Sequence, residues 1–323
     1  MKFDFISIGE ILIDFAPYGD VEACAFQQNP GGAPANVASV LAKLGVSSAF
    51  VGKVGNDSFG ISCKNALKSA NVCTDYMVIS EEYPTTLAFV TLDETGNREF
   101  SFYRNHTADV NLNLDDIAAL KGVSSKFFHF GSVSLTAEPE RSATLEAVKQ
   151  AKEQGSIISY DPNLRLPLWG DAQRAKTEIL NAFALADVLK ISEEEAQFLF
   201  GISDCEQAAK MIEQTYKIPF IMITRGPKGC YALVNGKGYH SYAYDLKTID
   251  TTGAGDSFLA GVLYRWISLD KSVEQLTEDE INEMFDFANA VGSLVTTKKG
   301  AIPAIPTLEE IHQCMQQQPK LIL

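Results

Sequence analysis

Residues 250–258 read DTTGAGDSF and place three small residues between two acidic positions, directly before an apolar run. The pattern predicts a helix that begins between Gly253 and Asp256, after a tight glycine turn. The apolar residues that follow recur at the spacing of one helical face: Phe258, Leu259, Val262, Leu263 and Trp266.

Asp256 has two interpretations at this junction. Asp commonly caps a helix by accepting hydrogen bonds from the first N–H groups. Alternatively, the unpaired N–H groups and the helix dipole form an anion site, and the carboxylate beside it takes part in chemistry. The stretch by itself leaves the two interpretations equal. It is not a Walker A loop, because no Gly-Lys-Ser/Thr follows, and it is not a GxGxxG dinucleotide fingerprint.

The composition of the 323 residues is typical of a folded globular protein, with 46% hydrophobic and 21% charged residues. The net charge of −14 argues against nucleic acids and anionic membranes as partners, because both require a positively charged face. The six cysteines form no CxxC pair and do not combine with the four histidines at metal-ligand spacing. With no signal peptide and no apolar stretch of about 18 residues, we expect a cytoplasmic protein.

Short β-rich runs alternate with helical patterns along most of the chain, which predicts an α/β fold with a central, mostly parallel sheet flanked by helices. Residues 85–103, TTLAFVTLDETGNREFSFY, interrupt this alternation as a hairpin with a turn around DETGN. With a strand near residues 10–17, the hairpin forms either a small separate sheet or an antiparallel edge of the main sheet. No linker or repeat divides the chain, so we expect one domain over residues 1–323.

A second glycine-rich loop precedes the first long helix, in NPGGAPANVASVLAKLG. Pro34 suits the first helical position and Gly45 suits the helix end. Gly31 and Gly32 then lie at the helix N-terminus, with Asn36 one turn further. Taken singly, this loop favours plain turn chemistry over a binding role.

The two glycine-rich stretches, GGAPANVA and DTTGAGDSF about 220 residues later, resemble in this order the two signature regions of the ribokinase-like (PfkB) carbohydrate kinases. The residues of these two stretches are most similar to those of the fructokinase branch of that family. Further segments match along nearly the whole chain: IGEILIDF at 8–15, VGKVGNDSFG at 51–60, FSFYRNHTAD at 100–109, YDPNLR at 160–165, ITRGPKG at 223–229 and KKGAIPAIP at 298–306.

The resemblance implies a small β lid, with strands at about 10–17 and 85–105, over a sugar site. It implies transfer of the ATP γ-phosphoryl group to a primary hydroxyl of a sugar, with D-fructose giving fructose 6-phosphate as the first choice. Asp256 is then the general base, because a carboxylate beside the anion hole can take the hydroxyl proton. The resemblance implies that the helix N-terminus at residues 253–256, with Gly253, Ala254 and Gly255, is the anion hole.

For the sugar, the resemblance implies contacts from Asp14, Gly31, Gly32, Asn36, Phe102, Arg104 and Arg165. The alternative for the arginines is surface ion pairing, which contributes little. Two arginines also suit a carboxylate, because the planar guanidinium binds it through two hydrogen bonds. A 2-keto-3-deoxygluconate kinase of the same family is therefore the second choice.

For the nucleotide, the resemblance implies Lys190, Ser192, Thr224, Gly226, Gly229 and Asn289. Ser192 stands where asparagine is typical of ribokinases, so its role stays open, and a polar core residue is the alternative for Asn289. Glu195 is expected to help place Mg²⁺ indirectly, since Mg²⁺ keeps waters and binds mainly through ATP oxygens. A K⁺ site near Asp250 and Thr252 is a further expectation.

Three further expectations concern the assembly, an alternative function and His129. The exposed lid strands need protection, so a homodimer that pairs two lids is a candidate assembly. A non-catalytic sugar or nucleotide sensor on the same fold is the alternative from another class, although such a protein would be expected to lose Asp256 or its glycines. His129, on the apolar run KFFHFGS, is interpreted as a hydrogen-bonded core histidine.

Overall fold

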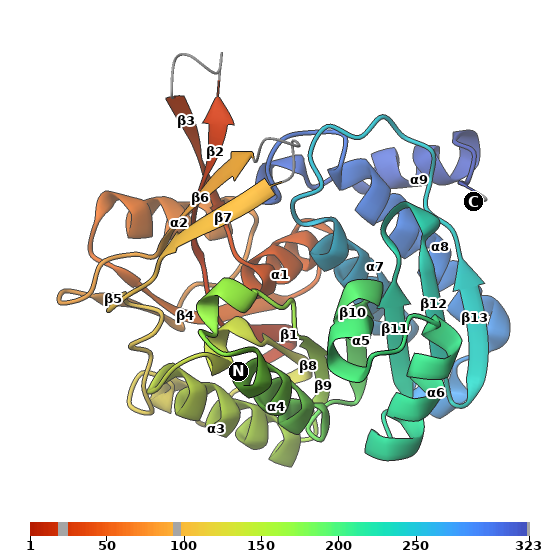
Figure 1. Ribbon diagram of the computed structural model, residues 1–323, viewed down its shortest axis with the longest axis horizontal. Coiled ribbons are helices and arrows are strands. Elements are labelled where there is room, and N and C mark those ends of the chain that lie inside the picture. Colours follow the sequence, from red (N-terminus) through yellow and green to blue (C-terminus); the bar gives the residue numbers. More distant parts are fainter. Residues whose placement is uncertain (19–24, 93–97, 322–323) are drawn as a thin grey trace.

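The computed structural model describes residues 1–18, 25–92 and 98–321. The described residues form two sheets, and the larger has the strand order β13-β12-β11-β10-β9-β8-β1-β4-β5 (Figure 1). From β5 to β11 every neighbouring pair is parallel, and β12 and β13 extend the sheet as antiparallel strands. The strands of this sheet are β1 (Lys2–Ile8), β4 (Ser48–Gly55), β5 (Met77–Ser80), β8 (Ser124–Gly131), β9 (Ile157–Asp161), β10 (Val188–Ser192), β11 (Phe220–Thr224), β12 (Cys230–Val234) and β13 (Lys237–Ser241).

Helices cover both faces of the larger sheet, and short 3₁₀ helices occur in several connections. The α-helices are α1 (Ala33–Lys43), α2 (Ser58–Ser69), α3 (Glu140–Glu153), α4 (Ala172–Phe183), α5 (Glu193–Phe200), α6 (Cys205–Tyr216), α7 (Ala254–Leu269), α8 (Glu278–Val295) and α9 (Leu308–Gln317). The 3₁₀ helices are η2 (Ala118–Leu120), η3 (Val133–Leu135), η4 (Leu166–Leu168), η5 (Gly226–Lys228), η6 (Val273–Gln275) and η7 (Ile302–Ala304). Among the described residues, no helix has both the length and the apolar character needed to cross a bilayer.

Two hydrophobic cores lie on opposite faces of this sheet. Side chains of a strand alternate between its faces, so neighbours such as Phe5 and Ile6 enter different cores. The first core contains buried side chains of α1, α2, α7, α8 and α9, and the second contains those of α3 to α6. This three-layer arrangement confirms the predicted fold class.

The first core also shows why the C-terminal helices pack closely. The apolar stripe of α8 is buried throughout, from Ile281 to Val291. Gly261 of α7 lies so near α8 that an added Cβ would be 2.7 Å from the Ala288 Cα. This close crossing fixes the position of α7, and with it the position of the helix start at Gly253.

The smaller sheet has the order β3-β2-β6-β7 and comprises β2 (Leu12–Tyr18), β3 (Ala25–Gly31), β6 (Leu87–Leu92) and β7 (Arg98–Tyr103). Figure 1 shows it apart from the larger sheet, so the separate-sheet interpretation is confirmed and the edge-strand alternative is wrong. The hairpin of β6 and β7 is antiparallel as predicted, and its DETGN turn, residues 93–97, lies outside the described residues. Strand β3 was not predicted, because AFQQNPG is a polar edge strand without the apolar alternation of a half-buried one.

Candidate functional site

A cavity of about 420 Å³ opens where the larger sheet, two helix N-termini and the smaller sheet meet. Parallel α/β sheets place ligands beyond the carboxyl ends of their strands, and the connections that follow β1, β8 and β9 line this cavity. Of the residues predicted from the sequence, the wall contains Asp14, Gly32, Asn36, Phe102, Arg165, Lys190, Thr252, Gly253, Ala254, Gly255 and Asp256. The others do not line it: Gly31, Arg104, Ser192, Glu195, Thr224, Gly226, Gly229, Asp250 and Asn289.

Asp256 does not cap its helix. Helix α7 begins at Ala254, its N-cap is Gly253, and no side chain caps it. The Asp256 carboxylate instead accepts hydrogen bonds from Asn36 Nδ2 at 2.8 Å and from Asn163 Nδ2 at 3.3 Å. Only 6% of the residue is exposed, so both carboxylate oxygens are held in fixed positions inside the cavity wall.

The N-terminus of α7 supplies the positive end of a helix dipole to the cavity. Gly253 has a φ of 75°, a left-handed conformation that glycine adopts without strain, and an added Cβ would lie 2.6 Å from the Ala301 Cβ. At Gly255 an added Cβ would lie 3.1 Å from Lys190 Nζ. Small residues at this turn therefore let the backbone and a lysine ammonium approach one another beside Asp256.

Buried charges surround Asp256. Lys190 Nζ donates to Asp161 Oδ2 at 2.6 Å, and both side chains are almost fully buried. Burial raises the pKa of Asp256 to about 6, and Asp161 adds to the rise, whereas Lys190, the Asn36 hydrogen bond and Arg165 oppose it. The Asp256 carboxyl therefore binds a proton more tightly than an exposed aspartate, yet remains mostly ionised at neutral pH.

The first glycine-rich loop packs against the end of β1. Gly32 has a φ of 143°, and an added Cβ would lie 2.4 Å from the carbonyl oxygen of Glu10. The Glu10 carboxylate in turn accepts a hydrogen bond from the Ala33 N–H at 3.0 Å, at the first residue of α1. Gly31 ends β3 and faces a neighbouring cavity near Asp14. Glycine is therefore required at position 32 by the close approach of the Glu10 backbone, and Gly32 also forms part of the cavity wall.

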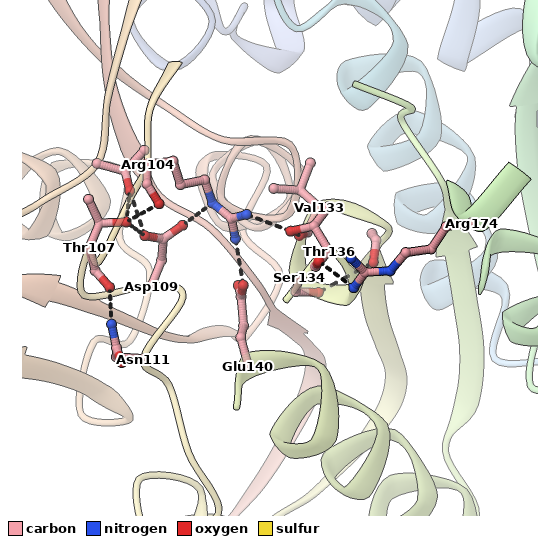
Figure 2. A network of polar contacts seen from close by, with 11 residues as sticks. Arg104, Thr107, Asp109, Asn111, Val133, Ser134, Thr136, Glu140 and Arg174 are labelled. Atoms are coloured by element: carbon pink, nitrogen blue, oxygen red, sulfur yellow. Dashed lines mark hydrogen bonds and ion pairs between the residues drawn. The ribbon is translucent and has the colours of Figure 1, made fainter. Parts of the chain in front are cut away.

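The two candidate arginines have different surroundings. Arg165 lines the cavity and donates to the carbonyl oxygens of Asn163 and Leu164. Arg104 is buried outside the cavity wall, where its guanidinium binds Asp109, Thr136 and Glu140 (Figure 2). The structure therefore does not bring Arg104 to the cavity with the other predicted sugar residues.

Four of the predicted nucleotide residues, Ser192, Thr224, Gly226 and Gly229, lie at the ends of β10 and β11 or in the turn after β11. Ser192 and Thr224 are paired at the carboxyl ends of β10 and β11. Ser192 is the N-cap of α5, and Glu195 completes the capping box, accepting hydrogen bonds from the N–H groups of Ser192 and Leu164. The Asn289 side chain donates to the Phe285 carbonyl oxygen one turn earlier in α8, which favours the polar-core interpretation of that residue.

Asp250 lies at a neighbouring cavity of about 180 Å³, which Asp14, Thr252 and Gly300 also line. Its carboxylate accepts hydrogen bonds from the N–H groups of Thr252 and Gly300. No group of three or more His, Cys, Asp or Glu side chains that could hold a metal ion occurs within residues 1–18, 25–92 and 98–321.

Sequence reasoning missed several residues of the site, and three of them are polar residues beside parallel strands. Asn163 binds Asp256, Asp161 pairs with Lys190, and Glu10 lines the cavity. Each follows or ends a parallel strand of the larger sheet. Polar residues directly after a predicted buried strand were the available signal, because such residues meet at the carboxyl edge of the sheet. His129 has its predicted place in the core, buried and hydrogen-bonded to Ser159.

Comparison with known families places the chain in a known class. The pfkB family carbohydrate kinase model matches residues 2–308, and the chain belongs to this family. The resemblance predicted from the two glycine-rich stretches is therefore confirmed, and the protein is a carbohydrate kinase.

Individual relatives are similar over nearly the full length. The probable fructokinase-6, chloroplastic, of Arabidopsis thaliana is 44% identical over 316 residues, covering 96% of this chain and 82% of that protein. Fructokinase-1 of Zea mays is 42% identical and covers 97% of both chains. A crystal structure of the Vibrio cholerae O395 fructokinase in fructose, ADP and calcium ion bound form has a TM-score of 0.88 at 35% identity, covering 97% of this chain and 99% of that one.

Replacing Asp256 by Asn should stabilise the folded protein at pH 7.5. The pKa of about 6 in the folded state exceeds the ordinary 3.8, so the wild type loses stability as the pH rises from about 4 to about 6. That shift corresponds to a free energy on the order of 3 kcal/mol, which the uncharged amide introduced by Asp256→Asn avoids. Urea unfolding at pH 4 and pH 7.5 should show the larger gain at pH 7.5.

The control for this measurement is Asp115→Asn, which removes an exposed carboxylate and should change neither value. An Asp256→Asn protein that is less stable than the wild type at pH 7.5 would show that the hydrogen bonds and charges around the carboxylate outweigh the cost of its burial, and would contradict the raised pKa.

Proposed function

We propose that this protein is an ATP-dependent fructokinase. The observation that carries the proposal is the Asp256 carboxylate held at the N-terminus of α7, inside a cavity that the smaller sheet helps to close. In support, the similar proteins of Arabidopsis thaliana and Zea mays are named fructokinases, and the similar Vibrio cholerae structure is named as holding fructose and ADP.

In the proposed reaction Asp256 is the general base. A primary hydroxyl of fructose gives its proton to the Asp256 carboxylate, and its oxygen forms a bond to the γ-phosphorus of ATP. The bond between that phosphorus and the bridging oxygen breaks, and ADP leaves with the electron pair. Asn36 and Asn163 hold the carboxylate in position, so little reorganisation is needed when the proton is transferred.

The N-terminus of α7 stabilises the charge that develops on the transferred group. Gly253, Ala254 and Gly255 line the cavity at the start of the helix, where the first N–H groups of a helix have no partner one turn earlier; the Ala254 N–H also donates to the Thr251 carbonyl oxygen. Lys190 adds a positive charge, which Asp161 keeps ionised in a buried setting.

For the nucleotide we propose Lys190, Ser192, Thr224, Gly226 and Gly229, which lie on β10, on β11 or in the turn after β11. Mg²⁺, when bound with ATP, neutralises phosphate charge. Both carboxylate oxygens of Glu195 already accept hydrogen bonds, from the Leu164 and Ser192 N–H groups. We therefore propose that Glu195 acts on the ion indirectly and is not a direct ligand. For Asn289 we favour a structural role.

For the sugar we propose Asp14, Gly32, Asn36, Phe102 and Arg165, which all line the cavity. The geometry favours fructose over 2-keto-3-deoxygluconate. The second choice needs two arginines for the substrate carboxylate, but the Arg104 guanidinium is already paired with Asp109 and Glu140. The sensor alternative is disfavoured, because the base and the small residues of the helix start are present together in one cavity.

An ATP-coupled assay with fructose, 2-keto-3-deoxygluconate, ribose and adenosine should give the highest kcat/KM for fructose. Asp256→Asn should lower kcat by about 10²- to 10⁴-fold, the usual contribution of a general base, while the protein stays folded. The exposed Asp115→Asn variant serves as the control. A higher kcat/KM for the keto acid would refute the choice of sugar, and substantial turnover by Asp256→Asn would refute the base.

We also propose that K⁺ binds where residues 249–252 meet residues 296–301, near Asp250 and Thr252. Backbone hydrogen bonds join Ile249 and Asp250 to Thr296, and Asp250 Oδ2 accepts from the Gly300 N–H. Loops of this kind offer carbonyl oxygens to a hard cation and place the Asp250 charge beside it. A Vibrio cholerae fructokinase variant whose structure is named as potassium ion bound supports the proposal.

Turnover should be several-fold faster in K⁺ buffer than in Na⁺ buffer of the same ionic strength. In Asp250→Asn the difference between the two buffers should shrink, because the charge beside the cation is lost. Equal rates of the wild type in both buffers would contradict the K⁺ site.

We further propose that the chain forms a homodimer through the smaller sheet. The face of this sheet opposite the cavity carries four aromatic residues, in which the rings of Phe15, Phe26 and Tyr103 each contact the ring of Phe89. Helix α2 covers one end of this face, where Phe59 packs on Phe15. Phe26 is 42% and Tyr103 64% exposed, and an aromatic face of this kind is a suitable surface for a second copy.

Size-exclusion chromatography with light scattering should give twice the mass of one chain for the wild type. Replacing both Phe26 and Tyr103 by Lys should give the mass of one chain, because the charges disrupt an apolar interface. Leu114→Lys, at an exposed apolar residue outside the smaller sheet, should leave the dimer intact. A wild-type protein of single-chain mass would refute the interface.

Two expectations from the sequence stay predictions. The first is one domain over residues 1–323, with the smaller sheet acting as the lid; in its support, the chain enters and leaves this sheet between strands of the larger one. The second is a cytoplasmic location. The similar Arabidopsis thaliana protein is named as chloroplastic, which differs from the location predicted here.

A further inference from the structure

A buried polar cluster lies at the base of the smaller sheet, outside the cavity wall. Figure 2 shows the Arg104 guanidinium at its centre. Arg104 Nε donates to Asp109 Oδ2 at 2.6 Å, one terminal nitrogen donates to Thr136 Oγ1 at 2.6 Å, and the other binds the Glu140 carboxylate. Arg104, Asp109 and Glu140 are each less than 9% exposed, so these contacts are shielded from water.

The cluster joins the two ends of the β6–β7 hairpin. Thr86 directly precedes β6, and Arg104 directly follows β7. Thr86 Oγ1 donates to the same Asp109 carboxylate that binds Arg104, and Thr107 Oγ1 donates to it as well, at 2.7 Å. Asp109 therefore fastens both strands of the hairpin at their base.

The same guanidinium fastens the hairpin to the main body. Glu140 is the first residue of α3, and Thr136 lies in the connection between β8 and α3. Thr136 Oγ1 donates to the Val133 carbonyl oxygen at 2.7 Å, and Arg174 of α4 donates to the Thr136 carbonyl oxygen at 2.8 Å. The cluster thus links the hairpin to α3, and through Thr136 to α4.

Two residues of the proposed sugar cavity are attached directly to this cluster. Phe102 precedes Arg104 by two positions in the same chain segment, and Val133 is hydrogen-bonded to Thr136. Phe102 belongs to the smaller sheet and Val133 to the main body, so their separation across the cavity depends on how the cluster holds the two parts together.

The charges of the cluster make this link strong and specific. Burial alone would lower the pKa of Arg104, but Asp109 and Glu140 raise it and keep the guanidinium ionised. Removing the cation would leave two buried carboxyl groups without their partner, which is far more costly than losing a surface ion pair. A lysine could keep the charge but could not make three hydrogen bonds in one plane.

We propose that Arg104 is a positioning residue that does not touch the sugar. By binding Asp109, Thr136 and Glu140, it fixes the base of the β6–β7 hairpin on the β8–α3 connection and sets the separation of Phe102 and Val133 for the substrate. The inference rests on the proposed fructokinase activity only for the identity of that substrate.

The test compares Arg104→Lys, Glu140→Gln and their combination with the wild type. Each single variant should raise the fructose KM at least tenfold, while the KM for ATP changes less than twofold and kcat less than threefold, because Asp256 and α7 are outside the cluster. In the double-mutant cycle, Glu140→Gln should add little once Arg104 is replaced. The matched control is Arg141→Met. Arg141 follows Glu140 in α3, is partly exposed and forms an ion pair with Glu178, so its loss should leave the fructose KM unchanged.

A second measurement does not depend on the sugar. Hydrogen exchange should speed up in both Arg104→Lys and Glu140→Gln for the amides of residues 84–92 and 98–109, and should stay unchanged in α7. If Arg104→Lys fails to fold, the triple change Arg104→Met, Asp109→Asn and Glu140→Gln removes the cation and both carboxyl groups together, and the hairpin amides should show the same faster exchange.

The outcomes separate this inference from the proposed function. A raised fructose KM in Arg104→Lys with an unchanged one in Glu140→Gln would show direct sugar contact by Arg104 and overturn the inference. Unchanged exchange at the hairpin would also overturn it. A wild-type protein that does not phosphorylate fructose, combined with faster hairpin exchange in both variants, would refute the proposed function and leave the anchoring role supported.

Discussion

The hydrogen bond from Asn36 Nδ2 to Asp256 Oδ2 joins residues 220 positions apart and fixes the N-termini of α1 and α7 beside each other. Both helices lie on the same face of the larger sheet and share its first hydrophobic core. Their close packing brings the two glycine-rich turns to one cavity. The positions of Asp256, of the α7 N-terminus and of part of the cavity wall therefore depend on the contact between α1 and α7.

The structure also depends on buried charges, which form two clusters of the same make-up. Around Lys190 lie Asp161, Glu195 and Asp256, and around Arg104 lie Glu10, Asp109 and Glu140. Each group has one cation and three carboxyl groups, so the acidic excess of the chain extends into its interior. In the first group this excess, together with burial, raises the proton affinity of Asp256, and in the second it binds the smaller sheet to the main body.

Prediction from the sequence succeeded where one local pattern was sufficient. Helix α7 begins within the predicted residues, and the apolar stripe of α8 is buried as its spacing indicated. Strand β3 was missed because a polar edge strand has no apolar alternation. Arg104 was assigned to the sugar because its neighbours matched a motif, but its partner Glu140 lies 36 residues further on, and no local pattern could indicate that pair.

The amino-acid sequence alone was sufficient to predict the alternation of helices and strands, the two glycine-rich turns, the family and the reaction that the family implies. These features depend on residue spacing and on ordered motifs, which are local properties of the chain. The packing of the folded chain was needed to show that Asp256 is held by two asparagines instead of capping its helix, and that Arg165 reaches the cavity whereas Arg104 does not. Such distinctions depend on which distant groups meet in a buried setting, because hydrogen-bond partners and desolvation are fixed only when the chain packs.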